Sequence, residues 1–210
     1  MDFSVVAVAR EDDSPVEGEG PTWDSFVLAT AIGRATERVA LTAGPVPVNV
    51  RDPYTTARGA ASVAALVGRP VGVALGTSSK RVVEGVHDRP RTRPAAVLED
   101  QAAAVRRFLQ ASPGEPVVPG SPFHRRLPPP GGPLTVAAFG PRAIATAAAH
   151  ADRMLLDVVS PEQVRALRAE LDAAARKAGR TRPALAAWRP RPSTPTRGRS
   201  RRCWAASPDI

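Results

Sequence analysis

Residues 24–79 read DSFVLATAIGRATERVALTAGPVPVNVRDPYTTARGAASVAALVGRPVGVALGTSS, and this stretch decides the fold. Apolar residues at helical spacing come first, then a short β-rich run at 39–43 and an irregular turn at 44–53 with three prolines. A second helical pattern ends at Gly68, a second short apolar run covers 71–75, and a glycine-containing loop follows at 76–79. Such alternation predicts parallel strands joined by helices, with ligands bound at the carboxyl ends of the strands.

The same alternation continues on both sides of this stretch. We expect about six parallel strands with intervening helices, at residues 3–9, 39–43, 71–75, 134–138, 154–159 and 184–188. Periodicity does not distinguish a closed barrel from an open doubly wound sheet. The proline-rich segment 111–133 is too long for an ordinary connection, so we expect an insertion or a lid.

The last segment, residues 189–210, differs in composition from everything before it. It is rich in Pro, Arg and Ser and has no hydrophobic period, so we expect a disordered tail after a domain spanning 1–188. Six arginines and one aspartate in this tail supply +5 of the formal net charge of +9. The body shows no basic face with interleaved aromatic residues, so nucleic acid is an unlikely partner.

The bulk composition favours a folded cytoplasmic protein. The single cysteine, Cys203, rules out a disulfide framework and fits a reducing compartment. The apolar run at 3–9 is too short to span a membrane and lacks the features of a signal peptide, so we expect no membrane association.

Two segments resemble the bacterial luciferase-like monooxygenase superfamily, most closely the branch that uses the deazaflavin coenzyme F420. One is residues 37–79, and the other is VAAFGPRAIATAAAHADRMLLDVVSPEQVRALRAELDAAARKAGR, residues 136–180. The motifs that carry the resemblance are Thr36-Glu37-Arg38, Arg51-Asp52-Pro53, Val67-Gly68-Arg69 and Leu75-Gly76-Thr77.

The resemblance implies a fold and a cofactor. The family fold is a (β/α)8 TIM barrel, and on that template this chain begins at the second strand and stops after the seventh. We therefore expect an incomplete barrel, truncated at both ends, whose cofactor is coenzyme F420 or, as the alternative, FMN.

Two turns match family positions that contact the cofactor. Gly44 and Pro45 stand where the family forms a bulge against the ring, because small residues let the backbone approach a flat ring closely. Phe139, Gly140 and Arg142 stand at a strand-to-helix turn that holds the coenzyme phosphate in the family, and a helix N-terminus favours an anion. The alternatives are a plain proline-rich turn and an ordinary helix start.

The loop Gly76, Thr77, Ser78 and Ser79 offers hydroxyls and backbone N–H groups to the same ligand, or is simply a polar loop. The basic residues that follow this loop either bind an anionic ligand or form a solvated surface. Among them, His87 is a candidate proton donor because imidazole titrates near neutrality. Glu11 is the second catalytic candidate, in a segment where many relatives carry an Asp-His pair.

The resemblance implies an oxidoreductase that transfers hydride to, or monooxygenates, a small organic substrate. One alternative is a catalytically inactive barrel fragment that pairs its open sheet edges with another chain, for instance as a homodimer. A weaker alternative is anion or nucleic-acid binding through the arginine-rich tail.

Overall fold

A computed structural model describes residues 5–6, 24–157, 159–188 and 204–205. Its centre is a sheet of five parallel strands, which follow one another in space in the order of the sequence. These strands are β2 (Leu41–Pro47), β3 (Val71–Gly76), β4 (Gly131–Ala137), β5 (Arg153–Asp157) and β6 (Ala184–Trp188). Five of the six expected strands thus form the expected parallel sheet.

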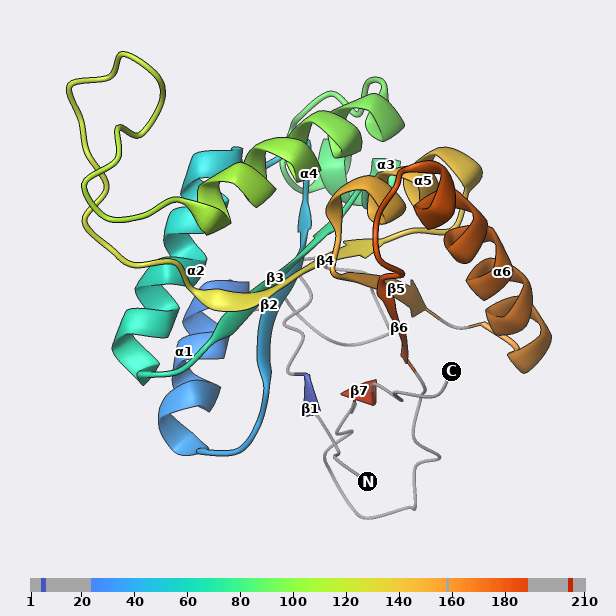
Figure 1. Ribbon diagram of the computed structural model, residues 1–210, viewed down its shortest axis with the longest axis horizontal. Helices are drawn as coiled ribbons and strands as arrows, with labels where there is room; N and C mark the ends of the chain where they lie inside the picture. Colours follow the sequence, from blue (N-terminus) through green and yellow to red (C-terminus); the bar gives the residue numbers. More distant parts are fainter. Residues whose placement is uncertain (1–4, 7–23, 158, 189–203, 206–210) are drawn as a thin grey trace.

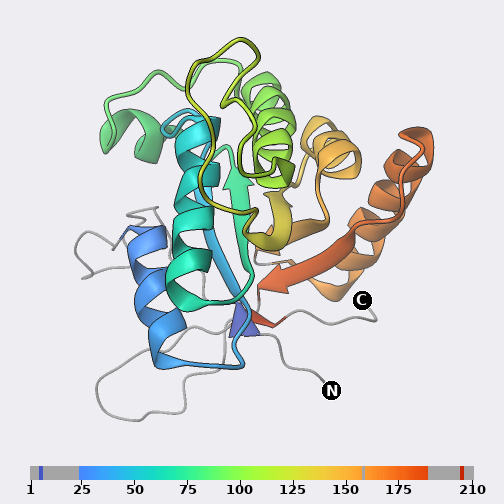
Figure 2. The same cartoon turned by 60° about the vertical axis from the view of Figure 1, so that its left-hand side comes forward.

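Helices connect the strands and pack along one face of the sheet (Figure 1, Figure 2). They are α1 (Ser25–Ala35), α2 (Pro53–Val67), α3 (Lys80–Gly85), α4 (Pro94–Gln110), α5 (Pro141–His150) and α6 (Pro161–Lys177). The core lies between this helical layer and the sheet, where aliphatic side chains of alternate strand positions meet those of the helices.

The two faces of each strand carry different side chains. On β4, Leu134 and Val136 belong to the core shared with the helices. Because side chains alternate along a strand, Thr135 and Ala137 face the opposite side of the sheet. On β3, Gly72 and Gly76 occupy that opposite face in the same way, so it is lined by small residues.

The ends of the helices follow local sequence signals. The side chain of Asp24 caps α1, and Gly68 ends α2 with a φ of 69°. Ser160 and Gln163 form a capping box at the start of α6, with each side chain accepting a hydrogen bond from the other residue's backbone amide. The helix end predicted at Gly68 is confirmed.

The structure differs from the expected pattern near the chain ends. The sequence predicts a parallel strand at 3–9, but its described residues, β1 (Val5–Val6), pair antiparallel with β7 (Trp204–Ala205). Strand β7 also pairs antiparallel with β6. Two residues of the expected tail therefore take part in the sheet, because β6 offers an edge with free backbone groups.

Two connections also differ. Residues 80–93, whose sequence shows no clear hydrophobic period, begin with the short helix α3, capped by Ser79. The 111–130 segment joins the end of α4 to the start of β4 and packs against the outer side of α2 and α4. It is therefore an insertion in the helical layer, not a lid over the carboxyl ends of the strands.

In the described part of the chain, no helix has the length and apolar character needed to cross a membrane.

Candidate functional site

The candidate site lies at the carboxyl ends of β2, β3 and β4. Strand β2 has a register shift between Ala43 and Val46, and the peptide bond between Gly44 and Pro45 is cis. Gly44 has a φ of 117°, and a Cβ atom placed on it would overlap the carbonyl oxygen of Ala74. Only glycine fits here, so the bulge expected at this position is present and depends on Gly44.

The bulge brings three small residues of neighbouring strands together. A Cβ atom built on Gly76 would lie 3.4 Å from the Cβ of Pro45 and 3.6 Å from the Cβ of Ala137. Pro45 and Ala137 are half-buried. Together Pro45, Gly76 and Ala137 form a low, smooth surface, which we call the small-residue platform.

The loop after β3 is held by an arginine that the sequence did not single out. The Nε atom of Arg91 donates to the carbonyl oxygens of Ser78 at 2.9 Å and Thr77 at 3.3 Å. Its guanidinium also donates to the Thr77 hydroxyl at 3.4 Å. Arg91 is thus used inside the protein, and the interpretation of the basic loop as purely solvated is wrong at this residue.

The hydroxyl groups of this loop differ in what they already bind. The Ser79 Oγ accepts from the backbone amide of Val82 and so caps α3. The Thr77 hydroxyl accepts from Arg91, while Ser78 adopts a positive φ of 52°. Arg91 and the Ser79 cap therefore fix the backbone of this loop, and two of its three hydroxyl groups serve the loop's own structure.

His87 lies just beyond α3, on the connection that leads from β3 to α4. Its backbone amide donates to the carbonyl oxygen of Val82 at 3.3 Å, and the residue as a whole is half-buried. The Nε2 atom is buried and has no hydrogen-bond partner in the described part of the chain. A buried imidazole nitrogen without a partner can exchange a proton only with a group that enters its surroundings.

The turn after β4 presents an open helix start. Gly140 is the N-cap of α5 and makes no side-chain cap, and Pro141 occupies the first turn. Phe139 is 51% exposed, and Arg142 is exposed beside the free backbone amides. Such a terminus binds anions through its N–H groups and the helix dipole.

An ion pair fixes the neighbouring edge of the site. Arg51, in the turn after β2, donates to Asp24 at 2.9 Å and lies 4.6 Å over the ring of Phe26. Burial works against ionisation of Asp24, but hydrogen bonds from the amide of Val27 and from Arg51 outweigh it and hold the pKa of Asp24 below its usual value. The start of α1 is thereby tied to the β2–α2 turn.

Sequence reasoning missed two further polar residues at the carboxyl ends of the strands. Asn49 follows β2, and its Oδ1 is buried without a hydrogen-bond partner among the described residues. Asp157 ends β5 and is half-buried. The signal that would have found both is position alone, because each stands where a parallel strand ends.

Glu11 lies outside the described residues. No group of three or more His, Cys, Asp and Glu side chains suited to a metal ion occurs in the part of the chain that the structure describes.

Comparisons with solved structures identify the architecture. F420-dependent tetrahydromethanopterin reductase from Methanopyrus kandleri superposes with a TM-score of 0.68 at 17% identity, over 90% of this chain and 66% of that one. An F420-dependent secondary alcohol dehydrogenase gives a TM-score of 0.71 at 16% identity, over 86% of this chain and 58% of the other. The EDTA monooxygenase of Chelativorans sp. BNC1 superposes with a TM-score of 0.64 at 19% identity, over 85% of this chain and 50% of that one.

At these identities the likeness shows the fold, which is part of a (β/α)8 TIM barrel. The chain spans between half and about two thirds of the length of these three structures. No match was found among curated proteins. The family model for luciferase-like monooxygenase matches residues 3–196, and the chain therefore belongs to the luciferase-like monooxygenase family.

Proposed function

We propose that the chain binds coenzyme F420, or alternatively FMN, at the carboxyl ends of β2, β3 and β4 and acts as an oxidoreductase on a small organic substrate. The observation that carries this proposal is the small-residue platform beside the open N-terminus of α5. Among the similar solved structures are two F420-dependent enzymes and a riboflavin lyase with modified FMN, so both cofactors stay in the proposal.

The platform fits a flat ring. Pro45, Gly76 and Ala137 carry no side chain longer than a proline ring, and the contact distances above leave no room between them for a larger one. The bound cofactor would supply the hydride or oxygen chemistry, while the protein orients it. The bulge at Gly44 sets how far the platform projects.

The start of α5 fits the phosphate of either cofactor. Its first backbone amides have no intrahelical partner, and Arg142 adds a positive charge in the first turn. Phosphate binding here would place the phosphate just beyond the end of β4, the strand that contributes Ala137 to the platform.

His87 is the proposed proton donor or acceptor. Its Nε2 is buried and has no hydrogen-bond partner among the described residues, so a group that reached it could exchange a proton with it. Glu11, the second candidate, keeps its proposed catalytic role from sequence position alone. The single cysteine, Cys203, supports a cytoplasmic setting for this activity.

Binding of F420 and of FMN, followed by fluorescence and equilibrium dialysis, tests the proposal. The decisive variant is Gly76→Ala, because its new methyl group makes only ordinary contacts with Pro45 and Ala137 and so spares the fold. We expect it to weaken cofactor binding about tenfold or more, since a ring that loses close contact loses about 1.4 kcal/mol or more. The control is Gly85→Ala, where a Cβ atom meets nothing within 4 Å.

Absence of binding for both cofactors at about a hundred micromolar would contradict the proposal. Equal affinity of the wild type and Gly76→Ala would place the ring elsewhere.

A second candidate, an inactive barrel domain that pairs through its sheet edge with a second copy, is favoured by one observation. Strand β2 stands at the end of the sheet order in the described part of the chain. Parallel strands with a free edge tend to recruit another strand. Sedimentation across a hundredfold range of concentration tests it, and a concentration-independent monomer would exclude the homodimer.

A further inference from the structure

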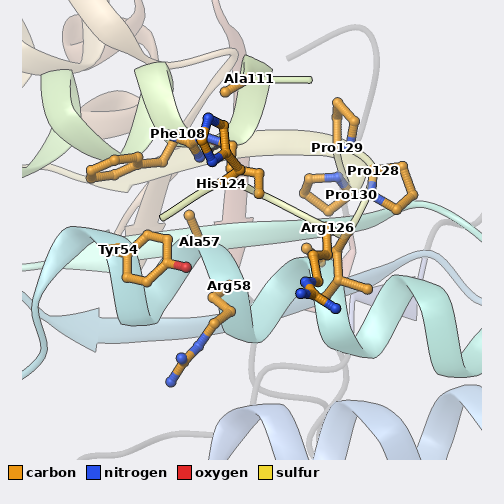
Figure 3. Close-up of a pocket in the computed structure, with 13 residues that line it drawn as sticks. Tyr54, Ala57, Arg58, Phe108, Ala111, His124, Arg126, Pro128, Pro129 and Pro130 are labelled. Carbon is orange, nitrogen blue, oxygen red and sulfur yellow. Dashed lines mark hydrogen bonds between the residues drawn. The ribbon is translucent and has the colours of Figure 1, made fainter. Parts of the chain in front are cut away.

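A pocket lies outside the barrel, on the far side of the helical layer from the sheet. Helices α2 and α4 form its floor, and the 111–130 insertion forms its rim (Figure 3). Its volume is about 250 Å³. Ordinary ligand pockets span roughly 300–1,000 Å³, so this size favours a ligand with a single ring.

The walls of the pocket are rigid and largely apolar. Tyr54 and Phe108 meet edge to face, with ring centroids 5.6 Å apart and planes at 66°. Figure 3 shows the consecutive prolines 128–130 on the side away from these rings. Proline has a fixed φ and aromatic rings have few rotatable bonds, so this wall loses little entropy when a ligand binds.

The charged side chains that line the pocket are all cationic. They belong to Arg58, Arg125 and Arg126, and no carboxylate of the described residues lines the pocket. Arg125 serves the rim itself, because it donates to the carbonyl oxygens of Val117 and Phe108 and lies 4.9 Å over the Phe108 ring.

The other two arginines are free to meet a ligand. Arg58 and Arg126 are exposed, and neither takes part in an ion pair within the described part of the chain. Arg58 lies 5.5 Å over the ring of Tyr54. Figure 3 shows the hydroxyl end of Tyr54 turned toward the side where Arg58 begins.

We propose that this pocket binds a small aromatic carboxylate. The ring of the ligand packs against Tyr54, Phe108 and the prolines, and its carboxylate meets both Arg58 and Arg126, since guanidinium groups pair with carboxylates through parallel hydrogen bonds. A neutral aromatic ligand would leave Arg58 and Arg126 without a partner. A small inorganic anion would leave the apolar walls in contact with water.

This site is separate from the cofactor site. None of its lining residues belongs to the small-residue platform, the Gly76–Ser79 loop or the start of α5. The proposal therefore stands whether or not the chain binds F420 or FMN.

Fluorine NMR of 4-fluorobenzoate with the full chain tests the proposal, with 4-fluorobenzamide as the neutral analogue and inorganic phosphate as competitor. We expect saturable binding of the acid with a Kd on the order of 0.1–1 mM, the range for a ligand of about ten non-hydrogen atoms. Arg126→Gln and Arg58→Gln should each weaken it about fivefold or more, because each removes one partner of the carboxylate. The matched control is Arg34→Gln, an exposed arginine of α1 that does not line this pocket.

Three results would overturn the proposal. Binding of the acid that does not saturate by about 10 mM would show that the pocket is not a specific site. Equal binding of the acid and the amide would show that the arginine charges play no part. Displacement by phosphate at equal concentration would show a general anion patch. Circular dichroism melts check that each variant is folded; if Arg58→Gln does not fold, Arg126→Gln decides alone.

Discussion

At the scale of single residues, Gly44 is the position on which the site depends most. Its φ of 117° and the overlap of any added methyl group with the Ala74 carbonyl both exclude a side chain. Gly68 offers a matched control, because it also has a positive φ, of 69°, but a Cβ atom there meets nothing within 4 Å.

We expect Gly44→Ala to lower the free energy of unfolding by about 3 kcal/mol or more, and Gly68→Ala by about 1–2 kcal/mol. The backbone strain is common to both variants, and the clash with β3 occurs only in the first. Urea denaturation measures both. Equal losses in the two variants would mean that β2 can move away from β3 without penalty.

Asp24 gives the stability a dependence on acid pH. Its folded pKa lies below 3.8, its ordinary value, because hydrogen bonds from Val27 and Arg51 outweigh the effect of burial. A lowered carboxyl pKa stabilises the fold fully above the ordinary value, and this stabilisation is lost as the pH falls through the folded pKa.

Asp24→Asn should therefore be less stable than the wild type at about pH 6, with the difference shrinking toward about pH 2.5. Asparagine still caps a helix, so the variant reports mainly the lost charge. Thermal melts across this range measure it. A difference that stays constant with pH would assign the effect to capping alone.

At the scale of elements, Arg106 joins three of them. From α4 its Nε donates to the carbonyl oxygen of His150 at 2.8 Å, and its guanidinium pairs with Asp152 at 2.6 Å. The other oxygen of Asp152 accepts from the backbone amide of Leu134 at 2.9 Å. One side chain thus links α4 to the end of α5 and to β4.

Arg106→Met should lower the free energy of unfolding by about 1.5–3 kcal/mol, since it leaves a charged acceptor and a backbone carbonyl without their donor. Arg107→Met is the control. Arg107 is exposed and lies 5.2 Å over the Phe108 ring, so its loss should cost no more than about 1 kcal/mol. Urea denaturation of both variants compares them, and equal losses would refute the linking role of Arg106.

At the scale of the whole molecule, the sequence predicts the features that leave a local signal along the chain, namely buried strands and helix ends. Apolar runs such as 71–75 mark strands covered on both faces, and residues such as Gly68 and Ser160 mark helix ends, because both signals are local. Pro45 and Gly76 are predictable as candidate site residues from the turns that hold them. Ala137 is not, because its role comes only from lying beside Gly76 in space.

The remaining features have no local signal. Arg91 bonds to carbonyl groups 13 and 14 residues away, and nothing in the spacing of residues 80–93 indicates it. The two-residue pairing of β1 with β7 is too short to show a period. The place of the 111–130 insertion depends on how α2 and α4 pack, which periodicity within either helix does not report.

The distribution of charge over the whole chain leads to a final prediction, that duplex DNA is not a physiological partner. The formal charge is +9, and six of the arginines lie within residues 189–202. Any binding to DNA should then come from the tail, be non-specific, and weaken steeply with salt, because it rests on released counterions.

We expect a duplex of about 20 base pairs to bind weakly in about 20 mM salt and not measurably at about 150 mM. Replacing Arg189, Arg191, Arg197, Arg199, Arg201 and Arg202 by serine should abolish the low-salt binding, measured by fluorescence anisotropy. The control replaces six exposed body arginines, for example Arg34, Arg38, Arg81, Arg89, Arg107 and Arg165, and should leave most of the binding. Tight binding at about 150 mM salt, or binding lost only in the control, would instead locate a nucleic-acid surface on the barrel.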